Sequence, residues 1–112
     1  MRRGADFRLF CLIVAATLAG GLAHADDNPR LTIRDHKFQP ERLEVPAGVK
    51  FRLTVKNDDT TAEEFESFEL NREKVVPAGR EIPVFLGPLE RGQYPFFGDF
   101  HRDTARGVLV VK

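Results

Sequence analysis

The feature that most constrains the fold is a short turn sequence, Val-Pro-Ala-Gly, which occurs twice. It spans residues 45–48 and again residues 76–79. The first copy leads into Val49–Lys56, where every second residue is apolar, and the second leads into Ile82–Leu86. A Pro–Gly turn ends an extended segment, and alternation with a period of two is typical of a half-buried strand. We therefore predict a protein built from short strands joined by tight turns.

Five further runs of β-type residues are separated by turn residues at regular spacing. They are Leu31–Arg34, Arg42–Val45, Glu64–Leu70, Tyr94–Phe97 and Val108–Lys112, with a turn expected at residues 35–40. About seven strands without a helical window predict an all-β fold, an antiparallel Greek-key β-sandwich. Pro83 predicts an edge strand, because proline donates no ladder hydrogen bond. Within the third run we expect Phe65 to face one way, and Phe68 and Leu70 the other.

The first 25 residues have the three parts of a secretory signal peptide. Three arginines lie within the first eight residues, Leu9–Ala19 is an almost uninterrupted apolar run, and Ala23-His24-Ala25 is a small-x-small cleavage site. The apolar run is too short to span a bilayer, which needs ~20 residues. Cys11 does not suggest a lipoprotein, because the apolar run continues past it. We expect a cleaved signal peptide (1–25), one domain (26–112) and a periplasmic location.

The composition of the mature chain excludes several classes of function. Three arginines and one aspartate belong to residues 1–25, so the 17 basic and 17 acidic residues become 14 and 16, a net charge of −2. This balance gives no electrostatic basis for binding nucleic acid or an anionic membrane. Cys11 and Met1 are the only residues of their kind, so any metal ligand in the mature chain must be histidine or carboxylate.

Two stretches gather residues that can bind a metal. One is residues 62–67, where alternation places Glu64 and Glu66 on one face of a strand. The other is residues 98–103, where His101 lies in the loop before the last strand. His36, in the first turn, is the only other histidine of the mature chain. Hydrated surface charges and a histidine that caps a loop explain the same residues equally well, so a metal site stays one of two interpretations.

The order of motifs along the mature chain resembles the cupredoxins. Phe38, Pro40, Leu43 and residues 45–48 form F-x-P-x-x-L-x-V-P-A-G, and F-x-L-T-V-x-N follows at residues 51–57. The run G-x-Y-x-F-x-x-x-x-H and a final G-x-L-V-V lie within residues 92–111. Residues 64–79 make the chain most similar to the cupredoxin-like domain of bacterial periplasmic iron-uptake systems. These are the EfeO type and the small stand-alone component of ferrous-iron permease operons.

The departures from the blue copper pattern are equally informative. That pattern has a cysteine three residues before the loop histidine and a methionine a few residues after it. Gly98 stands at the cysteine position, Ala105 or Arg106 at the methionine position, and Glu63 or Glu64 at that of the upstream histidine. A blue site depends on a copper–thiolate bond, so we predict that this chain holds no type 1 copper. Imidazole with carboxylates suits iron, manganese, zinc or Cu(II) and disfavours Cu(I).

The resemblance implies a periplasmic metal-binding accessory protein of ferrous-iron uptake that binds iron or copper. Its partner would be a periplasmic iron-binding protein or an inner-membrane iron permease. The residues expected to bind the metal are, first, Glu64 and His101 and, second, Glu66, Asp99, Glu63 and His36. The alternative is a metal-free cupredoxin-fold module that docks onto a transporter or a periplasmic partner. A third, enzymatic interpretation is ferroxidase activity, which would require redox cycling and an open coordination position. The sequence shows neither, so we favour a role without enzymatic activity and keep ferroxidase activity as an open alternative.

Overall fold

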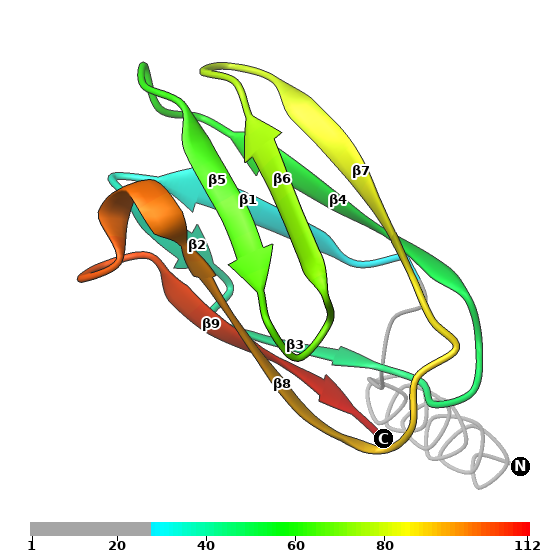
Figure 1. The fold of residues 1–112 in the computed structure, drawn as a ribbon. Helices are drawn as coiled ribbons and strands as arrows, with labels where there is room; N and C mark the ends of the chain where they lie inside the picture. The colour runs from blue at the N-terminus through cyan, green and yellow to red at the C-terminus, as the bar shows by residue number, and fades with distance from the viewer. Residues whose placement is uncertain (1–27) are drawn as a thin grey trace, which may run out of the picture.

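The computed structural model describes residues 28–112, and the predicted signal peptide lies outside them. Two β-sheets stack face to face (Figure 1). The strands are β1 (Arg30–Arg34), β2 (Lys37–Gln39), β3 (Arg42–Val45), β4 (Phe51–Asn57), β5 (Glu63–Ser67), β6 (Arg72–Val76), β7 (Glu81–Leu86), β8 (Gly92–Gly98) and β9 (Arg106–Val111). One short 3₁₀ turn, η1 (Asp99–His101), lies between β8 and β9 at one end of the sandwich.

The predicted two-sheet sandwich is confirmed, with corrections to its details. The sheets run β2-β1-β4-β7 and β3-β9-β8-β5-β6, so nine strands replace the expected seven. The extra strands are β2, inside the expected turn, and β6, which pairs with β5. The sheets are also not purely antiparallel, because β1–β4 and β3–β9 are parallel pairs. The chain crosses to the other sheet at β3 and returns at β4, which brings β4 alongside β1 in the same direction.

Alternating apolar residues of both sheets form one core. Phe38, Phe65 and Phe96 pack together there, with ring centroids 5.1–6.2 Å apart. Strands β1 and β4 add further buried side chains: Leu31, Ile33, Leu53 and Val55. Burying aromatic rings is the largest apolar contribution available to a chain of this size.

The two predicted Val-Pro-Ala-Gly turns are confirmed, whereas the predicted directions of Phe68 and Leu70 are wrong. Gly48 and Gly79 end the two Val-Pro-Ala-Gly segments at φ of 78° and 70°, which glycine adopts without strain. Pro83 lies on β7, an edge strand as predicted. Phe68 and Leu70 do not share a face, because β5 ends at Ser67 and both residues lie in the turn before β6. Leu70 is buried and Phe68 is exposed.

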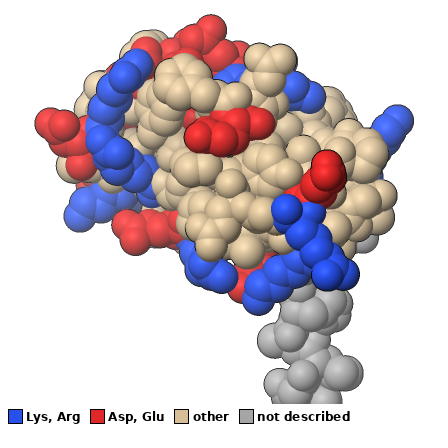
Figure 2. Space-filling view, turned by 60° about the horizontal axis from the view of Figure 1, so that its bottom comes forward, with Lys and Arg blue, Asp and Glu red and all other residues tan. Residues whose placement is uncertain are grey.

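Charged side chains of both signs are dispersed over the surface. On the face in Figure 2 they surround a mainly uncharged middle, and neither sign covers the face alone. This distribution agrees with the balanced composition of the chain.

We expect Phe38→Ala to destabilise the domain by about 3–5 kcal/mol, because it leaves a cavity beside two other rings. Phe85→Ala is the matched control, since Phe85 is 64% exposed and its truncation should change stability by less than about 0.5 kcal/mol. Urea unfolding of both variants measures the difference. Equal losses of stability would show that Phe38 is not a core residue.

Candidate metal centre

Strand β5 places alternate side chains in opposite environments. Glu63, Phe65 and Ser67 point into the sandwich and are buried, whereas Glu64 and Glu66 are only partly buried and point outward. The predicted common face of Glu64 and Glu66 is therefore confirmed. Because neighbours on a strand face opposite ways, Glu63 and Glu64 enter two separate clusters.

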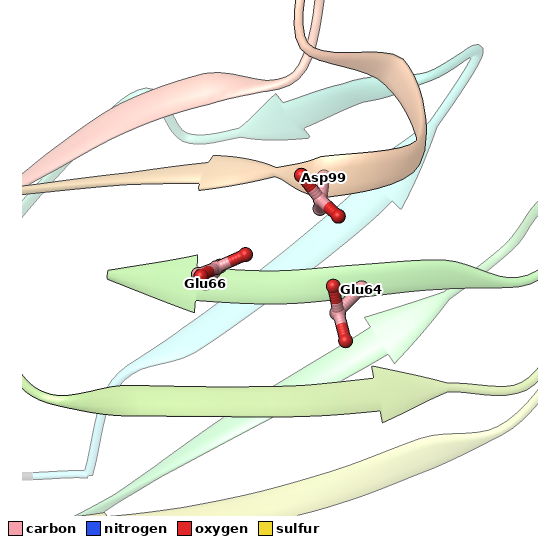
Figure 3. A group of neighbouring side chains, drawn as sticks. All are labelled: Glu64, Glu66 and Asp99. Carbon is pink, nitrogen blue, oxygen red and sulfur yellow. The ribbon is translucent and has the colours of Figure 1, made fainter. Parts of the chain in front are cut away.

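The outer cluster contains three carboxylates, Glu64, Glu66 and Asp99. Each offers an oxygen atom, and these atoms all lie within 4.8 Å of one another. Figure 3 shows Glu64 and Glu66 projecting from β5, with Asp99 beside them at the start of η1. An ion that binds several carboxylate oxygens at 2.0–2.6 Å needs oxygen atoms spaced in this way.

The electrostatic environment of the outer cluster raises the pKa of two of its carboxyl groups. The pKa of Glu64 is raised first by partial desolvation, then by its hydrogen bond with Asp99 and by the charge of Glu73. Partial desolvation also raises the pKa of Glu66, followed by the charges of Glu73 and Asp99. Glu73 lies directly opposite Glu66 on the neighbouring strand β6. The cluster therefore carries mutual repulsion that a bound cation would relieve.

Arg102 partly neutralises the outer cluster. Its Nε donates a hydrogen bond to Asp99 Oδ1 at 2.6 Å, and its guanidinium also lies 4.9 Å from the ring centroid of Phe97. The same side chain lowers the pKa of Glu66 and so opposes the repulsion described above. A metal ion would have to share Asp99 with this cation.

The inner cluster centres on the buried carboxylate of Glu63, which is 1% exposed. Its Oε1 accepts hydrogen bonds from the backbone N–H groups of Glu64 (2.9 Å) and Phe100 (2.8 Å). Its Oε2 lies 2.6 Å from His101 Nδ1. A carboxylate only accepts hydrogen bonds, so the Nδ1–H of His101 donates. Three donors thus meet one buried carboxylate, which is the condition for burying such a group at tolerable cost.

The turn between β1 and β2 covers His101 from the other side. Asp35 and His36 have φ of 53° and 59°, a left-handed conformation that L-residues adopt only when other contacts hold them. Asp59 supplies these contacts by accepting hydrogen bonds from the backbone N–H groups of Asp35 (2.7 Å) and His36 (3.0 Å). Buried Asn57 in turn accepts a hydrogen bond from the Asp59 N–H at 2.9 Å.

The two histidine rings are stacked, with centroids 3.6 Å apart and planes inclined by 13°. Imidazole lone pairs lie in the ring plane. Two nearly parallel rings therefore cannot direct their nitrogens at one ion. His36 Nδ1 lies 3.5 Å from Asp59 Oδ2 and forms no hydrogen bond within residues 28–112.

The six predicted ligand residues thus divide into two sets. Glu64, Glu66 and Asp99 come together, and His101 and His36 lie with Glu63 instead of with Glu64. The partner of His101 could have been found from the alternation that places Glu63 on the same face as Phe65. The roles of Asp59, Glu73 and Arg102 depend on turn geometry and strand register, for which the sequence alone gives no signal.

The residues at the cupredoxin copper position do not fit a type 1 copper ion. The required thiolate is missing at Gly98. A Cβ atom at Gly98 would lie 2.6 Å from Glu63 Cδ and 2.7 Å from Ala105 Cβ. The space for a thiolate is therefore filled by the Glu63 carboxyl group and Ala105.

Comparisons with known proteins agree with this fold. The family model of the cupredoxin-like domain matches residues 8–111. An uncharacterized protein of Rickettsia prowazekii (strain Madrid E) is 44% identical over 111 residues, which cover 92% of this chain and 89% of that protein.

Three solved structures also share the architecture at low sequence identity. Auracyanin from Roseiflexus castenholzii has a TM-score of 0.68 and 14% identity, and the match covers 79% of this chain and 98% of that one. A purple cupredoxin from Nitrosopumilus maritimus has a TM-score of 0.60 and 20% identity, with 75% of this chain and 99% of that one covered. Amicyanin from Paracoccus versutus has a TM-score of 0.61 and 17% identity, with 84% of this chain and 88% of that one covered. Such identities show the fold alone. Residues 28–112 contain no helix long and apolar enough to cross a membrane. Sandwich topology, family match and the position of the loop after β8 together place this chain in the cupredoxin-like domain family.

Proposed function

We propose that this protein is a periplasmic metal-binding accessory protein of ferrous-iron uptake, and that it binds iron through Glu64, Glu66 and Asp99. The observation that carries the proposal is the convergence of three carboxylate oxygens within 4.8 Å of one another on the outer face of β5. The raised pKa values of Glu64 and Glu66 support it, because they arise first from partial desolvation and then from neighbouring carboxylates, whose repulsion a cation would remove.

The donor set favours a hard cation over a soft one. Three carboxylate oxygens suit iron, manganese, magnesium or calcium, whereas Cu(I) prefers sulfur. The outer cluster is partly exposed, so an ion could enter and leave without opening the core. These properties suit a protein that receives iron and passes it to a permease or to a periplasmic iron-binding protein. The resemblance to iron-uptake cupredoxins points to the same system.

A metal-free interaction module is the second candidate function, and one observation favours it. The Glu63 carboxyl group fills the space beside Gly98, where the copper-binding cysteine of a cupredoxin would stand, and it already has three hydrogen-bond donors. In that case the fold would serve to dock onto a transporter. Its signature is an unfolding temperature that no metal changes, because a ligand that binds only the native state must stabilise it.

We expect calorimetric titration of the exported form with Fe(II) under anaerobic conditions, and with Mn(II), to show one site. Glu64→Gln and Asp99→Asn should each weaken binding by tenfold or more, that is, by about 1.4 kcal/mol. Arg102→Gln should strengthen binding, because it frees Asp99. Glu90→Gln, at an exposed glutamate on the β7–β8 connection, is the matched control. Unchanged affinity in Glu64→Gln would contradict the site, and no binding by any form would favour the docking module.

The raised pKa values predict a specific dependence on pH. Metal affinity should increase as the pH rises through the range in which Glu64 and Glu66 lose their protons. In the metal-free protein, ionised Glu66 opposes folding, because a carboxyl group whose pKa is raised on folding binds its proton more tightly in the native state. Glu66→Gln should therefore be more stable than wild type at pH 7, and this advantage should vanish near pH 3. Urea unfolding at both pH values measures it, and a constant difference would contradict the assignment.

Export is tested by expressing the full chain and measuring the mass of the protein in the periplasmic fraction. We expect a chain that begins at Asp26, after cleavage at Ala25. Ala23→Lys should block cleavage, because the site requires a small residue, and should leave a precursor with residues 1–25 attached. A full-length periplasmic protein in the wild type would contradict the predicted signal peptide.

A further inference from the structure

The inner cluster around Glu63 has a role of its own, which does not depend on whether the outer cluster binds iron. A loop that bears a metal ligand in a copper cupredoxin needs something to hold it when the metal ligands are missing. Within residues 28–112, the Glu63 carboxylate is the side-chain group of the neighbouring strand that makes the most hydrogen bonds to this loop. It bonds Phe100 and His101, both in η1, while its own backbone belongs to β5.

Both oxygen atoms of the Glu63 carboxylate accept hydrogen bonds. Three donors surround it at 2.6–2.9 Å: two backbone N–H groups and the His101 ring. Gly98 leaves the required space, because a Cβ there would lie 2.9 Å from Glu63 Oε1. Any side chain at residue 98 and a carboxylate at residue 63 exclude each other in this arrangement.

The rest of the loop closes on itself around this centre. The N–H of Gly98 bonds Ala105 O at 2.8 Å, and the N–H of Ala105 bonds His101 O at 2.9 Å. The stacked ring of His36 covers His101, held in place by the hydrogen bonds that Asp59 accepts. The loop is therefore held by hydrogen bonds and ring stacking from within the chain.

We infer that the Glu63 carboxylate takes the place of the metal in this chain: it ties η1 to β5 and positions His101 as a structural residue. Glu63 and Gly98 act as a pair in this role, the first filling the space that the second leaves open. Metal binding, where it occurs, is then confined to the outer cluster and does not set the conformation of the loop.

The first test measures thermal unfolding of the metal-free protein in the presence of a chelator. Removing one partner of a buried, hydrogen-bonded charge costs far more than removing an exposed charge, so Glu63→Ala should lower Tm by about 12 °C or more. The neighbouring Glu64→Ala, whose carboxylate lies in the outer cluster, is the control and should not lower Tm. Equal behaviour of the two variants would overturn the inference. If Glu63→Ala does not fold, Glu63→Gln should fold with a smaller loss, since its amide oxygen still accepts both backbone hydrogen bonds.

A double-mutant cycle tests the pairing of Glu63 with Gly98. Gly98→Ala alone should destabilise strongly, since the new methyl group meets both the Glu63 carboxyl group and the Ala105 side chain. In a Glu63→Gln/Gly98→Ala protein the side chain at residue 63 still fills the space and the clash remains. In Glu63→Ala/Gly98→Ala the carboxyl group is gone and only the contact with Ala105 remains, so the total loss in Tm should be clearly smaller than the sum of the single losses. Additive losses would show that Glu63 does not occupy the space beside Gly98.

The third test separates this inference from the proposed iron site. In a Glu64→Gln/Glu66→Gln/Asp99→Asn protein, Zn(II) at concentrations that saturate the wild type should leave the ¹⁵N signals of the His101 ring unshifted. A zinc-dependent shift of these signals in the triple variant would overturn the inference by making His101 a ligand. Absence of metal binding in the wild type would instead remove the proposed function and leave the role of Glu63 supported by the two stability tests.

Discussion

The burial of one carboxylate is the constraint on which the end of this sandwich depends. A charge such as that of Glu63, 1% exposed, is tolerable only where several donors meet it. Those donors come from β5 itself and from η1, so satisfying the charge also fixes the loop. The same requirement accounts for glycine at residue 98, since any Cβ there would enter the space of the carboxyl group. The burial of Glu63, the conformation of η1 and the glycine at residue 98 are thus linked by a single set of hydrogen bonds.

Strand alternation gives two adjacent glutamates opposite chemistry. Glu63 points inward and is surrounded by hydrogen-bond donors, whereas Glu64 points outward toward Asp99 and other acids. The inner carboxylate is satisfied by the protein. The outer ones are partly desolvated and lie close to like charges, and both effects, desolvation first, raise the pKa of Glu64. A carboxylate satisfied within the core and one that faces an outer acidic cluster therefore lie one residue apart.

Much of the architecture was predictable, because period-two alternation and Pro–Gly turns are local signals. Such signals predicted the strand at Val49–Lys56, found at Phe51–Asn57, the edge position of Pro83 and the common face of Glu64 and Glu66. The parallel pairing of β1 with β4 was not predictable, because it depends on where the chain crosses between sheets. For the same reason, the meeting of His36 with His101 is a product of tertiary packing across 65 positions, not of any motif.

The separation of the two clusters has a consequence for how such a protein could handle metal. Where an ion itself organises a binding loop, release of the ion also loosens the loop. Exchange of the ion is then coupled to the stability of the loop. Here the loop is already held by Glu63, and the outer carboxylates stand on strand β5 and on a loop fixed from inside. An ion bound outside can then leave while the surface around it keeps its shape. Arg102, bonded to Asp99, provides a positive charge that can retain this carboxylate after the ion departs. Under the proposed function, such a surface would meet a partner in the same shape before and after transfer of the ion.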